Sequence, residues 1–180
     1  MKSRFPIWLS VLISLLLLAF GLIYGNVSGY TDERTHADAL LTGDSGLLTV
    51  VGYRASDALN LCVVAERHLA GDADVAALRT DAEALRKSGL SPAAVKSGDA
   101  ALAEAFGTVA AKLKADAGFT QSTRDPQYLE MLTADFEEYG QSAIYDTYNK
   151  AAAEFNEKLS TPVLGDVARF FGVKPCELYE

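Results

Sequence analysis

The sequence has few of the residues that build metal and redox centres. Its 180 residues include two cysteines and two histidines, and Cys62 and Cys176 form no Cys-x-x-Cys pair. A zinc site needs several ligands, and among the helical neighbours of His68 only Asp72 has a ligating side chain, so we expect no metal site. The Glu-x-x-His pairs of di-iron bundles are also missing, and we predict no cofactor.

Signatures of phosphate binding and of nucleophilic catalysis are equally scarce. The small residues of Gly43-Asp44-Ser45-Gly46 lack the lysine of a phosphate-binding loop and follow no predicted strand. A catalytic triad assembled in three dimensions would have only His68 as its base. We therefore predict no catalytic residues, and we expect that the protein is not an enzyme.

Basic residues are too few for a nucleic-acid-binding protein. Lys and Arg number 16 against 24 Asp and Glu, which gives a formal net charge of -8. Nucleic-acid affinity depends on neutralising phosphates, and adsorption to anionic lipid also requires basic residues, so we predict neither. The acidic balance is expected to keep an exported domain soluble, with attraction of a basic partner as the alternative.

One stretch, from Phe5 to Thr31, contains no charged residue, and its centre is rich in leucine. Roughly 20 residues at about 1.5 Å per residue match a bilayer core of roughly 30 Å, so this run is long enough to cross a membrane. Lys2 and Arg4 precede the run, and Asp32 is the first charge after it. Because basic residues stay on the cytoplasmic side, we predict a cytoplasmic N-terminus and an external C-terminal domain.

The apolar run has two possible fates. A secretory signal has an apolar core of about 7–15 residues that ends in a small-x-small cleavage site, and Val27-Ser28-Gly29 resembles such a site. The core from Ile7 to Tyr24 is longer, and the aromatic residues Trp8 and Tyr24 are placed as interfacial anchors would be. We predict a retained single-pass anchor in the cell membrane, with cleavage as the alternative.

The rest of the chain is sufficient for one domain with its own core. We predict four parts, namely a cytoplasmic tail (1–4), a transmembrane helix (5–28), a mobile linker (29–46) that contains His36, and a helical bundle (47–180). No segment alternates with the period of two that a strand requires, so the predicted fold class is all-α.

Apolar residues recur every three or four positions over 48–69, 75–85, 95–113 and 128–159, which predicts four amphipathic helices with these apolar stripes. The last of these helices is expected to run from Asp125-Pro126 to about Leu159. Asp44 or Ser45, then Ser91, then Asp125 are the expected N-caps, and Ser91 and Asp125 are each followed by proline at the first helical position. Gly140 is expected to bend the last helix. Short connections favour an antiparallel four-helix bundle, followed by a short C-terminal helix that ends at Gly172.

The segment Tyr145–Glu180 carries a family resemblance. Its key residues, in order, are Tyr148, Asn149, Phe155, Asn156, Pro162, Phe171, Gly172, Tyr179 and Glu180. This order resembles the end of LemA family proteins, in which a YN…(Y/F)N helix precedes an FP turn, an FG pair and a terminal aromatic-acid pair. Thr161 stands where the family usually has an aromatic residue, and small apolar residues replace the basic ones of the first bundle helix. The chain resembles a divergent member, which implies an external four-helix bundle and no established enzymatic activity.

The residues of this C-terminal pattern also have a physical interpretation. Tyr148 and Phe155 lie two helical turns apart on one face, and Asn149 and Asn156 share that spacing. We predict that these four residues lock the last helix into the bundle; the alternative is an asparagine ladder that binds a partner or a ligand. The Phe170-Phe171 pair is expected to pack onto the bundle, and if exposed it would be a docking candidate.

Two questions remain open from the sequence. An oxidising exterior would permit a disulfide between Cys62 and Cys176, whereas Cys62 on an apolar stripe favours a free, buried thiol. The function is either that of an interaction or scaffold module with an envelope protein partner, or that of a small-ligand-binding sensory bundle. The predicted cytoplasmic part is too short to be an output domain, which favours the interaction module.

Overall fold

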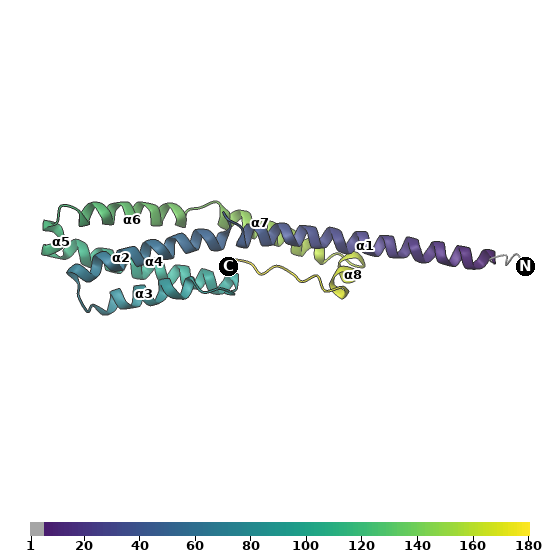
Figure 1. Ribbon diagram of the computed structural model, residues 1–180, viewed down its shortest axis with the longest axis horizontal. Coiled ribbons are helices and arrows are strands. Elements are labelled where there is room, and N and C mark those ends of the chain that lie inside the picture. Colours follow the sequence, from purple (N-terminus) through teal and green to yellow (C-terminus); the bar gives the residue numbers. More distant parts are fainter. Residues whose placement is uncertain (1–5) are drawn as a thin grey trace, which may run out of the picture. The chain divides into compact units, whose positions relative to one another are not determined.

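The computed structural model describes residues 6–180, and within this range every regular element is a helix (Figure 1). The predictions of an all-α fold and of one long apolar N-terminal helix are confirmed. Lys2, Arg4 and the predicted cytoplasmic tail lie outside the described residues. The helices are α1 (Ile7–Thr42), α2 (Leu47–His68), α3 (Ala73–Leu85), α4 (Pro92–Ala115), α5 (Ala117–Gln121), α6 (Asp125–Gly140), α7 (Ile144–Leu159) and α8 (Leu164–Phe170).

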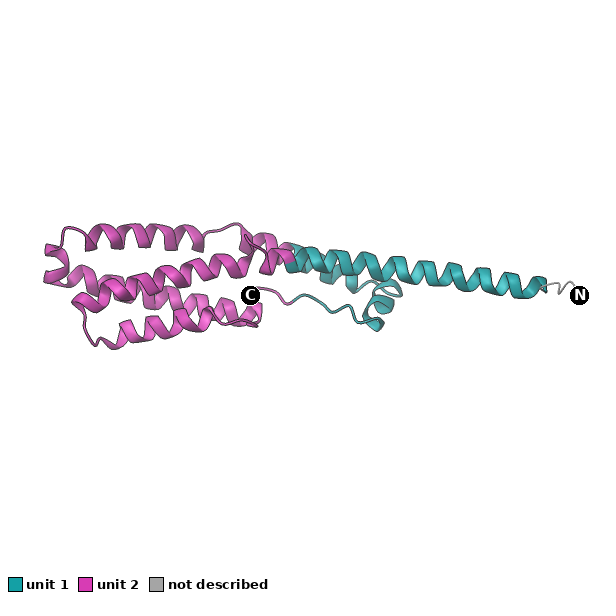
Figure 2. Cartoon of the chain, in the orientation of Figure 1, with its two compact units in different colours: residues 1–38, 151–176 teal, residues 39–150, 177–180 magenta. Residues whose placement is uncertain are grey.

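The chain divides into two compact units, shown in Figure 2. Unit 1 consists of Met1–Asp38 and Ala151–Cys176, and unit 2 consists of Ala39–Lys150 and Glu177–Glu180. The region 47–180, which we expected to form one domain, is therefore shared between the units.

The segment 29–46, which we expected to be a linker, is helical as far as Thr42. The residues from Tyr30 to Thr42 include no glycine or proline that would end a helix, and Arg34 forms an ion pair with Asp38 one turn later at 3.0 Å. The apolar run therefore continues into a polar helical extension, and His36 lies on α1 rather than in a flexible connection.

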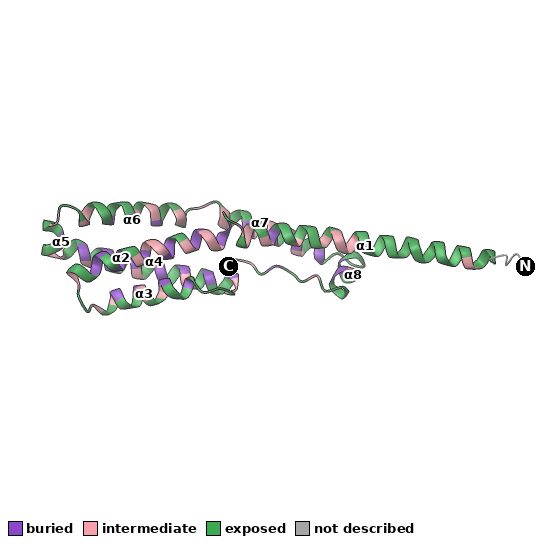
Figure 3. Cartoon of the chain, in the orientation of Figure 1, coloured by how far each residue is buried: buried purple, intermediate pink, exposed green. Residues whose placement is uncertain are grey.

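In unit 2, α2 packs against α3, α4 and α6, and α3 packs against α4. The apolar stripes predicted for α3 and α4 are buried as expected, and the buried residues of these helices appear in Figure 3. Ser91 caps α4 through its side chain, with Pro92 as the first helical residue. The prediction that Asp44 or Ser45 caps the first bundle helix is wrong, because Gly46 occupies that position without a side-chain bond.

The long helix predicted from Asp125-Pro126 to about Leu159 is in fact two helices, α6 and α7. Gly140 ends α6, and a β-carbon there would lie 3.2 Å from the guanidinium of Arg54, so a larger residue would press on that side chain. Two finer predictions are also corrected. Asp125 lies inside α6 rather than at its N-cap, and Tyr128 is exposed while its neighbour Leu129 is buried.

In unit 1, the C-terminal segment runs beside α1. The hydroxyl of Tyr30 donates to the carbonyl of Lys158 at 3.0 Å, and the amide of Asn26 donates to the carbonyl of Leu164 at 2.9 Å. The prediction that the Phe170-Phe171 pair packs onto the bundle is wrong, since Phe170 is 84% exposed. Cys62 and Cys176 are free and buried. The structure therefore has unpaired thiols rather than a disulfide between them.

Candidate functional site

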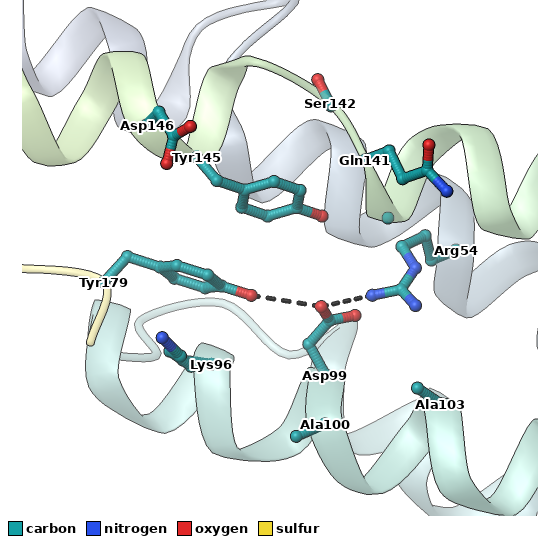
Figure 4. Close-up of a pocket in the computed structure, with 11 residues that line it drawn as sticks. Arg54, Lys96, Asp99, Ala100, Ala103, Gln141, Ser142, Tyr145, Asp146 and Tyr179 are labelled. Carbon is teal, nitrogen blue, oxygen red and sulfur yellow. Dashed lines mark hydrogen bonds and ion pairs between the residues drawn. The ribbon is translucent and has the colours of Figure 1, made fainter.

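The best-defined polar site of unit 2 is a cavity of about 410 Å³, shown in Figure 4. Its walls come from α2, α4, the end of α6, the connection to α7, the start of α7, and the last residues of the chain. The lining side chains that carry chemistry are Arg54, Lys96, Asp99, Tyr145, Asp146 and Tyr179.

A buried ion pair between Arg54 and Asp99 forms the floor of this cavity (Figure 4). Arg54 is 7% exposed and Asp99 is 8% exposed, although both are charged residue types. Arg54 also donates from Nε to the carbonyl of Phe136 at 3.2 Å, and its guanidinium lies 4.1 Å from the centre of the Phe136 ring. Buried charges are tolerated when they are paired and hydrogen-bonded in this way, so the pair joins α2 to α4.

Two tyrosines cover the ion pair. The hydroxyl of Tyr179 donates to Oδ2 of Asp99 at 3.1 Å, and the rings of Tyr145 and Tyr179 stack with centroids 5.1 Å apart. Burial raises the pKa of Tyr145 to about 12, and burial together with the nearby Asp99 carboxylate raises the pKa of Tyr179 as well. Both hydroxyls are therefore neutral at physiological pH and available as hydrogen-bond donors.

Two polar atoms of this cluster form no hydrogen bond with the described residues. Oδ1 of Asp99 and the hydroxyl of Tyr145 are buried and have no hydrogen-bond partner there. Burial raises the pKa of Asp99, while the Arg54 guanidinium opposes that effect. A buried polar atom without a partner costs about 1–3 kcal/mol, so these atoms are the natural contacts for a ligand or an ordered water.

The asparagines of the C-terminal pattern both hold the backbone of the chain's last residues. In unit 2, Asn149 accepts from the backbone N–H of Tyr179 at 2.7 Å and donates to its carbonyl at 2.8 Å. In unit 1, Asn156 makes the same two bonds with Cys176, at 2.8 and 2.9 Å. Each asparagine thus pairs with one residue of the C-terminal segment, as a neighbouring strand would.

The remaining residues of that pattern have separate positions. Tyr148 and Phe155 are buried, and the hydroxyl of Tyr148 donates to the carbonyl of Glu177 at 2.5 Å. Pro162 is exposed in the turn before α8, and Phe171 is exposed after it. Gly172 follows Phe171 with φ of 95°, which favours glycine, and Glu180 is exposed. The structure brings Tyr148, Asn149 and Tyr179 together and leaves Pro162, Phe171 and Gly172 in a different unit.

The Arg54–Asp99 pair was not predicted from the sequence, although the sequence holds a signal for it. Arg54 falls among the buried positions Val51 and Ala55 of α2, and Asp99 falls between Val95 and Leu102 on the stripe of α4. A charged residue at an apolar-stripe position indicates a buried partner on a facing helix. The two positions are 45 residues apart in the numbering, so the pairing itself requires the fold.

His68, the candidate weighed for metal binding, contacts two carboxylates that were not predicted as its neighbours. Its Nε2 lies 2.8 Å from Asp125, and its Nδ1 lies 3.8 Å from Asp116. Asp72, the expected neighbour, instead caps α3 and binds Lys112. No group of three or more His, Cys, Asp or Glu able to hold a metal occurs within residues 6–180.

Comparison of the chain with protein-family models, with curated proteins and with solved structures finds no match. The LemA resemblance of the C-terminal segment therefore stays a prediction that rests on the residues quoted for it.

A second acidic contact in unit 2 gives a testable pH dependence. Asp57 on α2 has a buried oxygen without a hydrogen-bond partner among the described residues, and its pKa is raised from 3.8 to about 6 by burial and by Asp135 on α6. A raised carboxyl pKa stabilises the fold at low pH, and this contribution is lost as pH rises through about 6. The phenol rings of Tyr53 and Tyr139 lie beside Asp57 and Asp135, with their ring centroids 5.3 Å apart.

Asp57→Asn is therefore expected to stabilise the protein above pH ~7 by about 1–2 kcal/mol, after allowance for solvent screening of a partly exposed group. The gain should disappear below pH ~4, where Asp57 is protonated in both states. Thermal unfolding across this pH range, with Glu138→Gln as an exposed carboxylate control on α6, measures the effect. A gain that is independent of pH would contradict the assignment.

Proposed function

We propose that this chain is a LemA-like protein, anchored in the cell membrane by α1, whose external helical bundle acts as an interaction or scaffold module. The observation that carries the anchor is the apolar part of α1, where an 18-residue window has mean hydropathy 2.5 and none of it is buried. Fully burying a leucine side chain is worth about 1.5–3 kcal/mol relative to leaving it in water. The exposed run Leu15-Leu16-Leu17-Leu18 therefore favours a lipid environment.

An antiparallel four-helix arrangement for the bundle is the finer part of this proposal. It is supported by the packing of α2 against α3, α4 and α6. The connections between α2 and α3 and between α3 and α4 are short, with Gly71 and Gly89 at positive φ. Short connections between packed helices favour antiparallel neighbours.

The interaction role rests on exposed apolar side chains of unit 2. Tyr128 is 52% exposed and Met131 is 48% exposed, and they lie three residues apart on α6, so they share one face. Tyr53 on α2 is also exposed. Aromatic residues and methionine are enriched in protein interfaces, so these positions are the places at which we expect a partner to be found.

A photo-crosslinking amino acid in place of Met131 tests the interaction role in intact cells. We expect one discrete product of higher mass, with the same partner recovered from Tyr128 and not from Thr80, an exposed polar position on α3. Diffuse products, or none from Met131, Tyr128 and Tyr53, would contradict an interaction surface on this unit.

The second candidate function, a ligand-binding sensory bundle, has one observation in its favour. Oδ1 of Asp99 and the hydroxyl of Tyr145 are unused by the described residues and line the cavity of Figure 4 beside Lys96. A small ligand with both donor and acceptor groups would satisfy them. Failure of the crosslinking experiment, with a partner absent at every position tested, would leave this alternative as the stronger one.

The membrane orientation has its own test. With Lys2 and Arg4 inside, a C-terminal tag on intact spheroplasts should be removed by external protease. A cytoplasmic marker protein in the same sample should survive until lysis. A tag that survives with the marker would reverse the proposed orientation.

A further inference from the structure

The exposed apolar residues around α8 form a cluster that neither the anchor nor the bundle uses. We call this cluster the apolar tip; it consists of Val163, Leu164, Phe170 and Phe171. Val163 is 70% exposed and Phe170 is 84% exposed. The rings of Phe170 and Phe171 pack edge to face, with their centroids 5.3 Å apart. Single exposed apolar residues are ordinary, but four within nine positions indicate a surface that binds something apolar.

Contacts within unit 1 fix where this cluster lies along α1. Lys158 binds Glu33 at 3.0 Å, and the carbonyl of Lys158 accepts from Tyr30. Six residues later, the carbonyl of Leu164 accepts from Asn26, which is nearer the apolar end of α1. The segment therefore advances along α1 toward its N-terminal end, and α8 lies beside α1 in Figure 2.

The segment then turns back. Cys176 accepts a hydrogen bond from Arg34, so the chain after α8 returns to a level of α1 beyond Glu33. The apolar tip is therefore the part of the C-terminal segment closest to the apolar run of α1. Asn26 lies two residues past Tyr24, which is about 3 Å along the helix axis. The tip is thus held at the level at which α1 changes from apolar to polar.

The backbone around α8 is constrained to present these side chains outward. Gly165 and Ala168 form its buried side, and a β-carbon at Gly165 would overlap the carbonyl of Leu159. Val163 has φ of 72°, which is an outlier for a β-branched residue. Such strain persists where the surrounding structure imposes it, and it concentrates at functional positions.

We propose that the apolar tip inserts into the interfacial layer of the same bilayer that α1 spans, giving unit 1 a second membrane contact. This inference rests on the proposed anchoring by α1. Lipid is the partner because Asn26 fixes the tip at the edge of the apolar run. Interfacial segments place Phe and Leu about 5–10 Å into the headgroup and acyl boundary.

The charges near the tip specify which lipid surface it fits. Asp166 and Arg169 pair with each other at 2.6 Å, so α8 presents little net charge. The contact therefore depends on apolar insertion rather than on attraction to anionic headgroups. Phosphatidylcholine, which is zwitterionic, is sufficient for the test.

Depth-dependent fluorescence quenching in full-length protein tests this inference. Trp8 is the single tryptophan of the chain, so the wild type reports on α1. The variant Trp8→Phe/Phe170→Trp reports on the tip, and Trp8→Phe/Ala153→Trp is the control, on an exposed position of α7 that precedes the Phe155–Tyr30 contact. All three proteins are placed in phosphatidylcholine liposomes whose acyl chains carry bromine at shallow or deep positions.

We expect the indole introduced by Phe170→Trp to lose emission, more with shallow than with deep bromines, and to shift to shorter wavelength relative to the Ala153→Trp control. Phe171→Trp in the same background should give the same pattern. Quenching of Trp8 without quenching at positions 170 and 171 would overturn the inference and leave the anchor intact. An unquenched Trp8 would overturn the proposed anchoring, and the inference with it.

Discussion

Arg54→Met is expected to lower the free energy of unfolding by about 3–5 kcal/mol, because it leaves the buried Asp99 carboxylate without its cation. The loss also removes the bond from Arg54 to the carbonyl of Phe136. For a chain of this size each kcal/mol corresponds to roughly 2–4 °C in melting temperature. Thermal unfolding of the full-length protein in detergent, followed by circular dichroism, measures the change.

Two further variants separate the buried pair from the general effect of losing an arginine. Arg67 lies on α2, as Arg54 does, and forms an exposed ion pair with Asp125 of α6. Arg67→Met removes this pair and should cost less than about 1 kcal/mol. The double variant Arg54→Met/Asp99→Leu should recover part of the stability, since it removes the orphaned charge, although the Tyr179 hydroxyl then loses its acceptor. Equal destabilisation by Arg54→Met and Arg67→Met would contradict a buried pair.

Phe155→Ala is the second change with a large expected effect. Phe155 is 2% exposed and its ring contacts the ring of Tyr30 edge-on at 6.5 Å. Truncation of a buried phenylalanine costs about 3–5 kcal/mol, a large part of the roughly 5–15 kcal/mol that stabilises an ordinary domain. We expect an early thermal transition, measured in the same way.

Phe170→Ala is the matched control, because it removes the same side chain from an exposed position of the same unit. Its melting temperature should stay within the error of the wild type. The two variants, Phe155→Ala and Phe170→Ala, also separate the two interpretations of the C-terminal pattern. A Phe155→Ala protein that melts normally yet loses a crosslinked partner would make Phe155 part of a binding surface.

The elements that the sequence predicted well are those set by local periodicity and local caps. The stripes of α3 and α4 and the Ser91-Pro92 start of α4 depend on residues within a few turns of one another. The apolar run of α1 is equally local. These features follow from side-chain spacing and backbone chemistry, which the sequence shows directly.

The features that the sequence did not predict depend on contacts between distant residues. The helix break after Gly140 places that glycine against Arg54, and the cavity depends on Asp99 meeting Arg54. The bonds of Asn149 to Tyr179 join residues 30 positions apart. The polar extension of α1 was not predicted for a different reason. Segment 29–46 has few apolar residues and was therefore predicted to be a linker, although its residues as far as Thr42 favour a helix.

The two free cysteines have a consequence for how the protein responds to oxidants. Burial raises the pKa of both Cys62 and Cys176, so both stay protonated, and the thiolate is the form that reacts. The native chain is therefore slow to exchange disulfides or to form sulfenic acid. Unfolding exposes either sulfur to oxidants, so mixed disulfides would accumulate only on molecules that have lost their structure.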